Sequence, residues 1–424
     1  MKILLATDTY FPYINGGSYF VIHLAHGLRD RGHQVFVVTM AESFQDVVNH
    51  VGGITEYRIR SIPLPTYNKF RVSPLVLSRQ SIVRAVKAIA PDVVHLQHHF
   101  YIGRGVFEVA RELGIPAIGT NHSLPDNVVY YFHLPRWGGE LVEKFGWKQF
   151  RDVYDQLDVV AAPTKTAADI TQLHLRVRQV IPVSNGIDLA RYRPDHDAEY
   201  LRERYRLPAR NVILYTGRLD REKRIEVLLE ALVEVRKTID AHLVITGIGG
   251  VQRQLREHTR KIGLTEHVTF TGFVSDEDFP AIYCAAHVFA IASVAELQSL
   301  VTMEAVASGL PVVAVNAKAL PELCHDGENG FIFAEDDVAG CARGLLTILG
   351  DDALRQRMSQ ASLEIISHHS LDKTISTYEG LYRRAIAMHA DPSAQGVSSP
   401  ALYDMTKPNQ FAWQTANLAN GSHP

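Results

Sequence analysis

The chain has 424 residues, of which 46% are hydrophobic and 21% charged, with a formal net charge of −3. This length exceeds a single ordinary core, so we expect two α/β domains. No run of 18 apolar residues occurs, and Asp8 comes too early for a secretory leader, so the sequence predicts neither a membrane-spanning helix nor an export signal. Cys284, Cys324 and Cys341 are odd in number and lack metal-ligand spacing, which favours core packing in a reduced, cytoplasmic protein.

The first half of the sequence alternates apolar runs with amphipathic stretches, which is typical of a doubly wound parallel sheet. The expected strands cover residues 2–7, 34–39, 92–96, 117–120, 159–162 and 180–183, and the expected helices cover residues 18–31, 79–90, 104–113, 139–156 and 165–173. Gly16 and Gly17 precede the first helix, whose free backbone N–H groups would suit an anion. The pattern is not Gly-x-Gly-x-x-Gly, so it gives no support to a hydride-transfer cofactor.

A basic stretch lies in this half, which carries 19 Lys and Arg against 16 Asp and Glu over residues 1–188, a formal charge of +3. Residues 57–91 contain no acid and the cations Arg58, Arg60, Lys69, Arg71, Arg79, Arg84 and Lys87. Aromatic and aliphatic residues lie between them, so the stretch is a candidate contact for an anionic membrane surface, where each cation contributes about 1 kcal/mol. Nucleic acid is not expected as a partner, because the overall charge is negative and no nucleic-acid-binding motif occurs.

Histidines follow two neighbouring strands of this half. His122 comes after the strand at residues 117–120, and the carboxyl ends of parallel strands line the ligand site in open α/β sheets, so His122 is a candidate for substrate contact. His95, His98 and His99 end the preceding strand. A metal site there lacks an accompanying acid cluster or cysteine pair, so we expect acceptor contact or packing instead.

The second half places two cations after a strand and a glycine turn. Its strands are expected at residues 212–216, 242–246, 268–271, 288–292 and 312–315, with an amphipathic helix over residues 225–238. Arg218 and Lys223 follow Gly217 in the loop before that helix, where a planar fork and a point charge suit a diphosphate that gains negative charge. The alternative is that these cations pair at the surface with Asp220 and Glu222.

Two glutamates bracket the segment Glu296-Leu-Gln-Ser-Leu-Val-Thr-Met-Glu304. Glu296 precedes a helix expected from about Ser299 and Leu300, so its carboxylate and the first free backbone N–H groups can meet one polar ligand. Glu304 lies inside that helix, where its two acceptor oxygens can bind a vicinal diol such as a ribose.

The spacing of these glutamates, together with Gly217-Arg218-Leu and Asn185-Gly-Ile-Asp188, resembles the retaining glycosyltransferases of family four, which have the glycosyltransferase-B fold. The family's usual Glu-Gly-Phe-Gly-Leu-Pro is Glu296-Leu-Gln-Ser-Leu here, which is more similar to the diacylglycerol glucosyltransferase branch. The resemblance implies two Rossmann-like, doubly wound parallel-sheet domains that face a central cleft. An acceptor domain would cover residues 1–188, a donor domain residues 189–370, a helix packing back on the first domain residues 371–388, and a loosely ordered tail residues 389–424.

The resemblance also implies the retaining transfer of a hexose from a nucleoside-diphosphate sugar of the UDP-glucose type to an acceptor hydroxyl. His122 would hold the sugar and Glu296 its hydroxyls, while Arg218 and Lys223 would stabilise the departing diphosphate. The implied donor contacts are Gly16, Gly17, Gly217, Gly247, Val274, Ser299, Leu300 and Glu304, where the glycines let a nucleotide lie close to the backbone.

Neither a metal nor another cofactor is expected, since cations and helix amino termini can neutralise the leaving group. Two Asp-x-Asp runs resemble metal motifs of other glycosyltransferases. We interpret Asp195-His-Asp197 as charged surface and Asp276-Glu-Asp278 as the start of a helix capped by Ser275.

The acceptor is less constrained by the sequence. Residues 122–150 are dense in aromatic and apolar side chains, which suit either a membrane lipid or an ordinary buried helix and loop. A lipid acceptor would fit peripheral contact with the inner face of the plasma membrane, and the alternative is a soluble glycan or natural product. A nucleotide-sugar epimerase or a phosphorylase would share the architecture, although their additional site residues cannot be placed. A nucleotide-binding module without catalysis is a third alternative, based on the missing glycines around Gln298.

Overall fold

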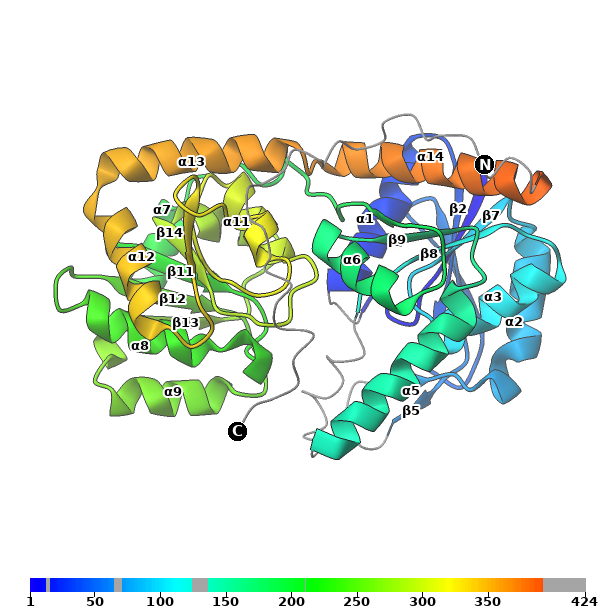
Figure 1. Cartoon of the computed structure of the whole chain (residues 1–424), viewed down its shortest axis with the longest axis horizontal. Helices are drawn as coiled ribbons and strands as arrows, with labels where there is room; N and C mark the ends of the chain where they lie inside the picture. The colour runs from blue at the N-terminus through cyan, green and yellow to red at the C-terminus, as the bar shows by residue number, and fades with distance from the viewer. Residues whose placement is uncertain (13–15, 65–70, 124–135, 210, 392–424) are drawn as a thin grey trace.

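The computed structural model describes residues 1–12, 16–64, 71–123, 136–209 and 211–391. Two large sheets of mostly parallel strands lie side by side, each packed against helices (Figure 1). The predicted pair of parallel-sheet α/β domains is therefore confirmed. Lys69, the apolar run at residues 124–135 and the expected tail from residue 392 onward lie outside the described residues.

The first sheet has eight strands in the order β10-β9-β8-β7-β1-β2-β4-β3. They are β1 (Lys2–Ala6), β2 (Gln34–Met40), β3 (Val47–Val51), β4 (Ile54–Ile59), β7 (Val93–Leu96), β8 (Ala117–Thr120), β9 (Val159–Ala162) and β10 (Val180–Pro182). All six predicted strands are present. The sequence analysis missed the antiparallel hairpin of β3 and β4, because the side chains of β3 are almost all exposed and give no apolar alternation.

Four of the five predicted helices of the first domain begin two to four residues earlier than predicted. They are α1 (Gly16–Asp30), α2 (Leu75–Ile89), α3 (Tyr101–Glu112), α5 (Arg136–Tyr154) and α6 (Lys165–His174), and a short ribbon pairs β5 (Ile62–Pro63) with β6 (Arg71–Val72). Gly16 and Gly17 therefore form the first turn of α1 rather than a loop before it. Their N–H groups are among those that a helix leaves without an internal partner.

The second sheet is parallel throughout its described strands, in the order β13-β12-β11-β14-β15-β16. The strands are β11 (Val212–Thr216), β12 (His242–Thr246), β13 (Val268–Gly272), β14 (Val288–Ile291), β15 (Val312–Val315) and β16 (Gly330–Phe333). Four of the first five are almost wholly buried, which explains their unbroken apolar sequences. The sequence analysis missed β16, which is short and begins with a glycine.

The second domain is covered by helices of varied length. They are α7 (Glu199–Tyr205), η1 (Arg221–Lys223), α8 (Ile225–Val235), α9 (Gln252–Lys261), η2 (Thr265–His267), α10 (Phe279–Cys284), α11 (Leu300–Ala307), η3 (Leu320–Glu322), α12 (Val338–Gly350) and α13 (Asp352–Ser367). The predicted helix start at Asp276 is wrong. Ser275 Oγ accepts a hydrogen bond from Asp278 N at 3.2 Å, and this turn precedes a helix that begins at Phe279.

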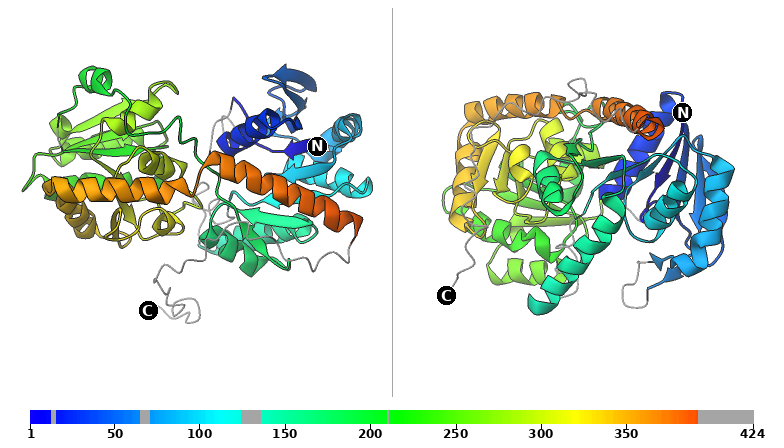
Figure 2. Two further views of the ribbon diagram at one scale, coloured as in Figure 1. Left: turned by 90° about the horizontal axis from the view of Figure 1, so that it is seen from above. Right: turned by 45° about the vertical axis from the view of Figure 1, so that its right-hand side comes forward.

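Helices α13 and α14 (Leu371–Ala390) run end to end across both domains (Figure 2). Helix α14 buries Tyr378, Leu381 and Tyr382 in the core of the first domain. The two connections between the domains are hydrogen-bonded to each other, since Ile187 N donates to His369 O at 2.9 Å and Leu371 N to Ile187 O at 2.9 Å. No helix in the described part of the chain is both long and apolar enough to span a membrane.

The junction requires a glycine at position 186. Gly186 has a φ of +76°, and an added Cβ would lie 2.7 Å from Leu371 Cα. A side chain at this position would be both strained and obstructed. The Asn-Gly-Ile-Asp segment that marked the family resemblance is thus a packing requirement where the chain passes between the domains.

Candidate active site

Loops from both domains meet at the junction between the two sheets. Tyr19 OH in α1 donates to Asp276 Oδ1 at 3.0 Å. An added Cβ on Gly16 would lie 3.7 Å from Leu300 Cδ1, so the first turns of α1 and α11 face each other. Gly16 and Leu300, which the sequence analysis singled out separately, are therefore brought together by the fold.

Lys223 and Glu296 form an ion pair at this junction. Lys223 Nζ lies 2.6 Å from Glu296 Oε1, and the two side chains are only 16% and 13% exposed. Burial acts to raise the pKa of Glu296, but the Lys223 ammonium, with smaller contributions from Ser293 and Arg218, lowers it overall. Glu296 is therefore ionised at neutral pH, and η1 and the loop before α11 are held together by opposite charges.

Arg218 has a different environment from Lys223. It is 48% exposed, and its guanidinium lies 2.7 Å from Asp220 Oδ2 and 3.1 Å from Glu222 Oε1. The alternative that the sequence left open, pairing with neighbouring acids, is thus observed for Arg218 and not for Lys223. Glu222 is only 8% exposed, whereas Asp220 is 22% exposed. Ion pairs near the surface contribute only about 0–1 kcal/mol, so Arg218 can exchange Asp220 for a phosphate at little cost.

Glu304 is surrounded by tyrosines that the sequence analysis did not identify. Tyr283 OH in α10 donates to Glu304 Oε2 at 2.5 Å, and Tyr192 also hydrogen-bonds to this carboxyl group. Burial raises the pKa of Glu304 to about 7, even though both tyrosine hydrogen bonds act to lower it. The carboxyl group therefore titrates near neutral pH. No sequence motif links these tyrosines to Glu304, because they come from separate segments.

The predicted donor-binding backbone has structural roles of its own. Gly217 and Gly247 have φ values of +137° and +126°, and an added Cβ on Gly247 would lie 2.0 Å from Gly217 O. Glycine at 247 is thus required by the close packing of two loops, which differs from the predicted reason, room for a nucleotide. Ser299 Oγ caps α11 by accepting from Thr302 N at 3.3 Å, and Val274 is 5% exposed, so Val274 offers a ligand mainly its backbone.

Gln298 connects the segment between the two glutamates to the domain junction. Its Oε1 accepts from Asn185 N at 2.7 Å, and its Nε2 donates to Ser184 Oγ at 2.9 Å. The neighbouring Leu297 O accepts from Thr164 Oγ1 at 2.8 Å. The sequence analysis treated Gln298 only as a departure from the family's wording, whereas the structure shows a buried amide that joins the two domains.

His122 lies on the first domain's side of the junction. Its Nε2 is 2.8 Å from Gln97 Oε1, and its ring packs against Phe20 with 4.9 Å between the ring centroids. Burial lowers the pKa of His122 to about 3, so the ring is neutral at physiological pH. His122 therefore contributes an uncharged ring to the junction.

The other strand-end histidines take part in packing. His95 bonds to Thr120 Oγ1 at 2.8 Å and to Tyr382 OH at 2.9 Å, and His99 contacts the ring of Phe150 edge-on. Within the described ranges, no group of three or more His, Cys, Asp or Glu side chains is arranged to hold a metal ion.

Acids from neighbouring segments neutralise much of the basic stretch. The pairs are Arg58 with Glu56, Arg60 and Arg84 with Asp46, and Arg79 with Glu112. The absence of acids within residues 57–91 therefore overstates the positive charge of this surface, because the compensating carboxylates come from elsewhere in the sequence.

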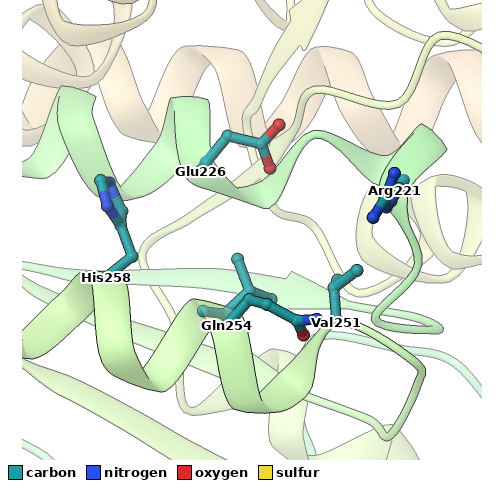
Figure 3. Close-up of a pocket in the computed structure, with 6 residues that line it drawn as sticks. Arg221, Glu226, Val251, Gln254 and His258 are labelled. Atoms are coloured by element: carbon teal, nitrogen blue, oxygen red, sulfur yellow. The ribbon is translucent and has the colours of Figure 1, made fainter.

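A surface hollow of about 210 Å³ lies between α8 and α9 in the second domain (Figure 3). Arg221, Glu226, Val251, Gln254, Leu255 and His258 line it. None of the predicted site residues contributes to this hollow, so it is separate from the junction where Lys223 and Glu296 meet.

Two parallel-sheet domains whose loops meet around Glu296, Glu304 and the largely buried Lys223 have the architecture of the glycosyltransferase-B fold. Sucrose-phosphate synthase from Thermosynechococcus elongatus has a similar structure, with a TM-score of 0.74 and 22% identity over 91% of this chain and 99% of that chain. Anabaena Alr3699/HepE, solved in complex with UDP and glucose, gives a TM-score of 0.71 and 19% identity over 89% of this chain and 98% of that chain.

The family follows from sequence comparison. Residues 14–191 match the model of Glycosyltransferase Family 4, and residues 197–364 match that of Glycosyl transferases group 1. The chain is 30% identical to alpha-monoglucosyldiacylglycerol synthase of Streptococcus pneumoniae over 86% of this chain and 83% of that protein. It is 27% identical to sulfoquinovosyl transferase SQD2 of Arabidopsis thaliana over 84% and 68%, and 23% identical to a GDP-mannose-dependent alpha-mannosyltransferase of Corynebacterium glutamicum over 95% and 92%. The chain belongs to glycosyltransferase family 4 and resembles its diacylglycerol glucosyltransferase-like branch, as predicted.

Proposed function

We propose that this glycosyltransferase moves a hexose from a UDP-glucose-type donor to a hydroxyl group of a membrane lipid, with retention of the anomeric configuration. The buried pair of Lys223 and Glu296 beside the start of α11 is the observation that carries the proposal. The Lys223 ammonium can bind the diphosphate of the donor, and the adjacent Glu296 carboxylate can bind the hydroxyl groups of its sugar.

The four predicted catalytic residues and Glu304 have roles in this mechanism, in which His122 contacts the transferred sugar. Lys223 and Arg218 stabilise the diphosphate as the bond to the anomeric carbon breaks, and Glu296 binds the sugar hydroxyls. Glu304 accepts hydrogen bonds from the ribose while retaining its contact with Tyr283, because a carboxylate has about four acceptor sites. The acceptor oxygen forms the new bond on the face that the leaving group vacates, and its proton passes to the departing phosphate.

The start of α1 complements the donor site. Gly16 and Gly17 present N–H groups that lack helical partners, opposite Leu300. Cations and helix amino termini together supply the charge stabilisation that a divalent metal supplies in other glycosyltransferases, so we propose that the reaction is metal-independent.

A lipid acceptor is supported by the relatives and by the surface of the first domain. One relative is named for a glucosylated diacylglycerol. Leu75 in α2 adjoins Gly105 in α3, so the starts of these helices are neighbours. Large apolar side chains are exposed there, namely Val76 (96%), Leu77 (44%), Phe100 (40%) and Tyr101 (38%). Such a patch suits peripheral contact with a membrane.

A direct assay tests donor, acceptor and stereochemistry together. The protein is incubated with labelled UDP-glucose or GDP-mannose and vesicles that contain diacylglycerol and anionic lipid, with and without EDTA. We expect an α-linked glucolipid from UDP-glucose at an EDTA-independent rate. Transfer only to soluble glycans, transfer from GDP-mannose alone, or loss of activity in EDTA would contradict the lipid acceptor, the donor or the metal independence respectively. Conversion of the free nucleotide sugar would favour an epimerase instead.

A further inference from the structure

Gln97 is a buried amide beside the candidate site that the mechanism above does not use. It follows β7, is 1% exposed, and its Oε1 lies 2.8 Å from His122 Nε2. Its Nε2 is buried and has no hydrogen-bond partner among the described residues. A half-satisfied buried amide costs free energy relative to an apolar side chain of the same shape, so its contact with His122 calls for a functional explanation.

The contact determines the protonation pattern of the histidine ring. A carbonyl oxygen only accepts hydrogen bonds, so His122 Nε2 carries the hydrogen and donates it to Gln97. Because the ring is neutral, Nδ1 then has a lone pair and acts as an acceptor. Phe20 packs against the same ring and fixes its plane.

We propose that Gln97 is a positioning residue that holds His122 as the Nε2–H tautomer, so that Nδ1 accepts a hydrogen bond from a hydroxyl group of the transferred sugar. This inference rests on the proposed function, in which His122 contacts the sugar. Beyond that function, the inference assigns the tautomer of His122 and the direction of its hydrogen bond with the sugar. It also names Gln97 as the residue that sets both.

Nitrogen NMR of histidine-labelled protein tests the tautomer without any substrate. The His122 signal is assigned by its loss in His122→Gln. We expect a protonated Nε2 and an unprotonated Nδ1 in the wild type, the same pattern in Gln97→Glu, and a mixture in Gln97→Met. Gln172→Met is the matched control, because Gln172 also lies in the first domain and its amide bonds, among the described residues, to the backbone of Val177 and Val180.

Kinetics test whether the tautomer matters for transfer. In Gln97→Met we expect kcat/KM for the donor to fall about tenfold, the effect of losing roughly one hydrogen bond in the transition state, with the acceptor KM unchanged. Gln97→Glu keeps an acceptor oxygen toward Nε2 and loses no existing bond, since Gln97 Nε2 has no described partner. We therefore expect it to retain activity at high pH.

Gln97→Glu should also introduce a new pH dependence. A carboxylate beside the ring raises the pKa of His122, and a protonated ring can no longer accept, so activity should fall as the pH is lowered. Burial lowers the pKa values of the neighbouring His95 and His98, so they stay neutral over this range. Burial raises the pKa of Asp8, whose backbone N–H donates to His98 Nδ1, to about 6, and this group is common to the wild type and both variants. The wild type and Gln172→Met should show only the acidic loss of donor binding that protonation of Glu304 causes, and Gln97→Glu should show a further loss beyond it.

The possible failures are distinguishable. Wild-type kinetics in Gln97→Met, or a protonated Nδ1 in the wild type, would overturn the role of Gln97 alone. Absence of sugar transfer by the wild type would overturn the proposed function and the sugar contact together, whatever the NMR spectrum shows.

Discussion

The two domains contribute different chemistry to the junction. The second domain supplies charges that are already paired, Lys223 with Glu296 and Arg218 with Asp220 and Glu222. The first domain supplies neutral groups, in particular His122, which burial keeps uncharged. A nucleotide sugar has a charged diphosphate and a neutral hexose, so this division matches the two parts of the donor. The comparison also predicts that substitutions on the charged side cost more than those on the neutral side.

The largest effect is expected from Lys223→Ala. This change leaves the buried Glu296 carboxylate without its cation, and breaking one partner of a buried pair costs about 3–5 kcal/mol. We expect both a lower melting temperature and the loss of nearly all transfer, measured by calorimetry and by the vesicle assay. The double variant Lys223→Met with Glu296→Leu should recover stability but not activity. Lys237→Ala is the control, since Lys237 forms only an exposed pair with Glu234.

Arg218→Ala should separate activity from stability. Arg218 is 48% exposed, but its partner Glu222 is only 8% exposed, so the melting temperature should fall, although less than in Lys223→Ala. If Arg218 leaves these acids to bind the diphosphate, transfer should lose about 3 kcal/mol of transition-state stabilisation, the effect of one preorganised donor. Turnover at the wild-type rate would remove Arg218 from the mechanism and confine the charge stabilisation to Lys223.

The same contrast explains what could be predicted from the sequence. Glu296, Glu304 and Lys223 were predicted because their spacing and flanking segments together resemble a family pattern, and their role in binding stays a prediction. Arg218 was predicted for the same reason. Its pairing with neighbouring acids was only one of two alternatives, since a loop sequence does not fix the direction of a long side chain.

The partners that tune the site could not be predicted. Tyr283 and Gln97 are neutral, and each reaches its partner only through the tertiary fold. Gln298 was noticed as an exception to a motif, yet its bonds to Asn185 and Ser184 depend on how the two domains are joined. Apolar periodicity predicts buried strands because burial selects a regular apolar pattern. It misses the hairpin of β3 and β4 because β3 is exposed and carries no such pattern.

Gln298→Ala tests whether the charged side is held in place from the junction. The change leaves Asn185 N without a side-chain acceptor in a buried position and should cost about 2 kcal/mol of unfolding free energy. We also expect a higher KM for the donor, because Glu296 lies in the same loop. Ser362→Ala is a suitable control, since it removes a buried hydrogen bond to Leu310 O in the same domain, away from the junction. An unchanged donor KM in Gln298→Ala would show that the loop keeps its position without this link.

The smallest effect is a pH dependence that has opposite signs for binding and for stability. The pKa of Glu304 is raised by burial to about 7, so donor binding through the ionised carboxylate should strengthen about tenfold between pH 6 and pH 8. Stability should change the other way. In the unfolded chain Glu304 loses its proton near its ordinary pKa of 4.5, whereas in the folded protein it does so only near pH 7. The folded protein therefore binds more protons between these pH values, and the contribution of Glu304 to stability is lost as the pH rises through this range. Glu304→Gln cannot ionise and should flatten both profiles, as measured by titration with UDP and by thermal melts. Profiles that remain unchanged in this variant would mean that a group other than Glu304 controls the pH dependence of donor affinity. The charged groups that bind the donor would then include Lys223 and Glu296 but not Glu304.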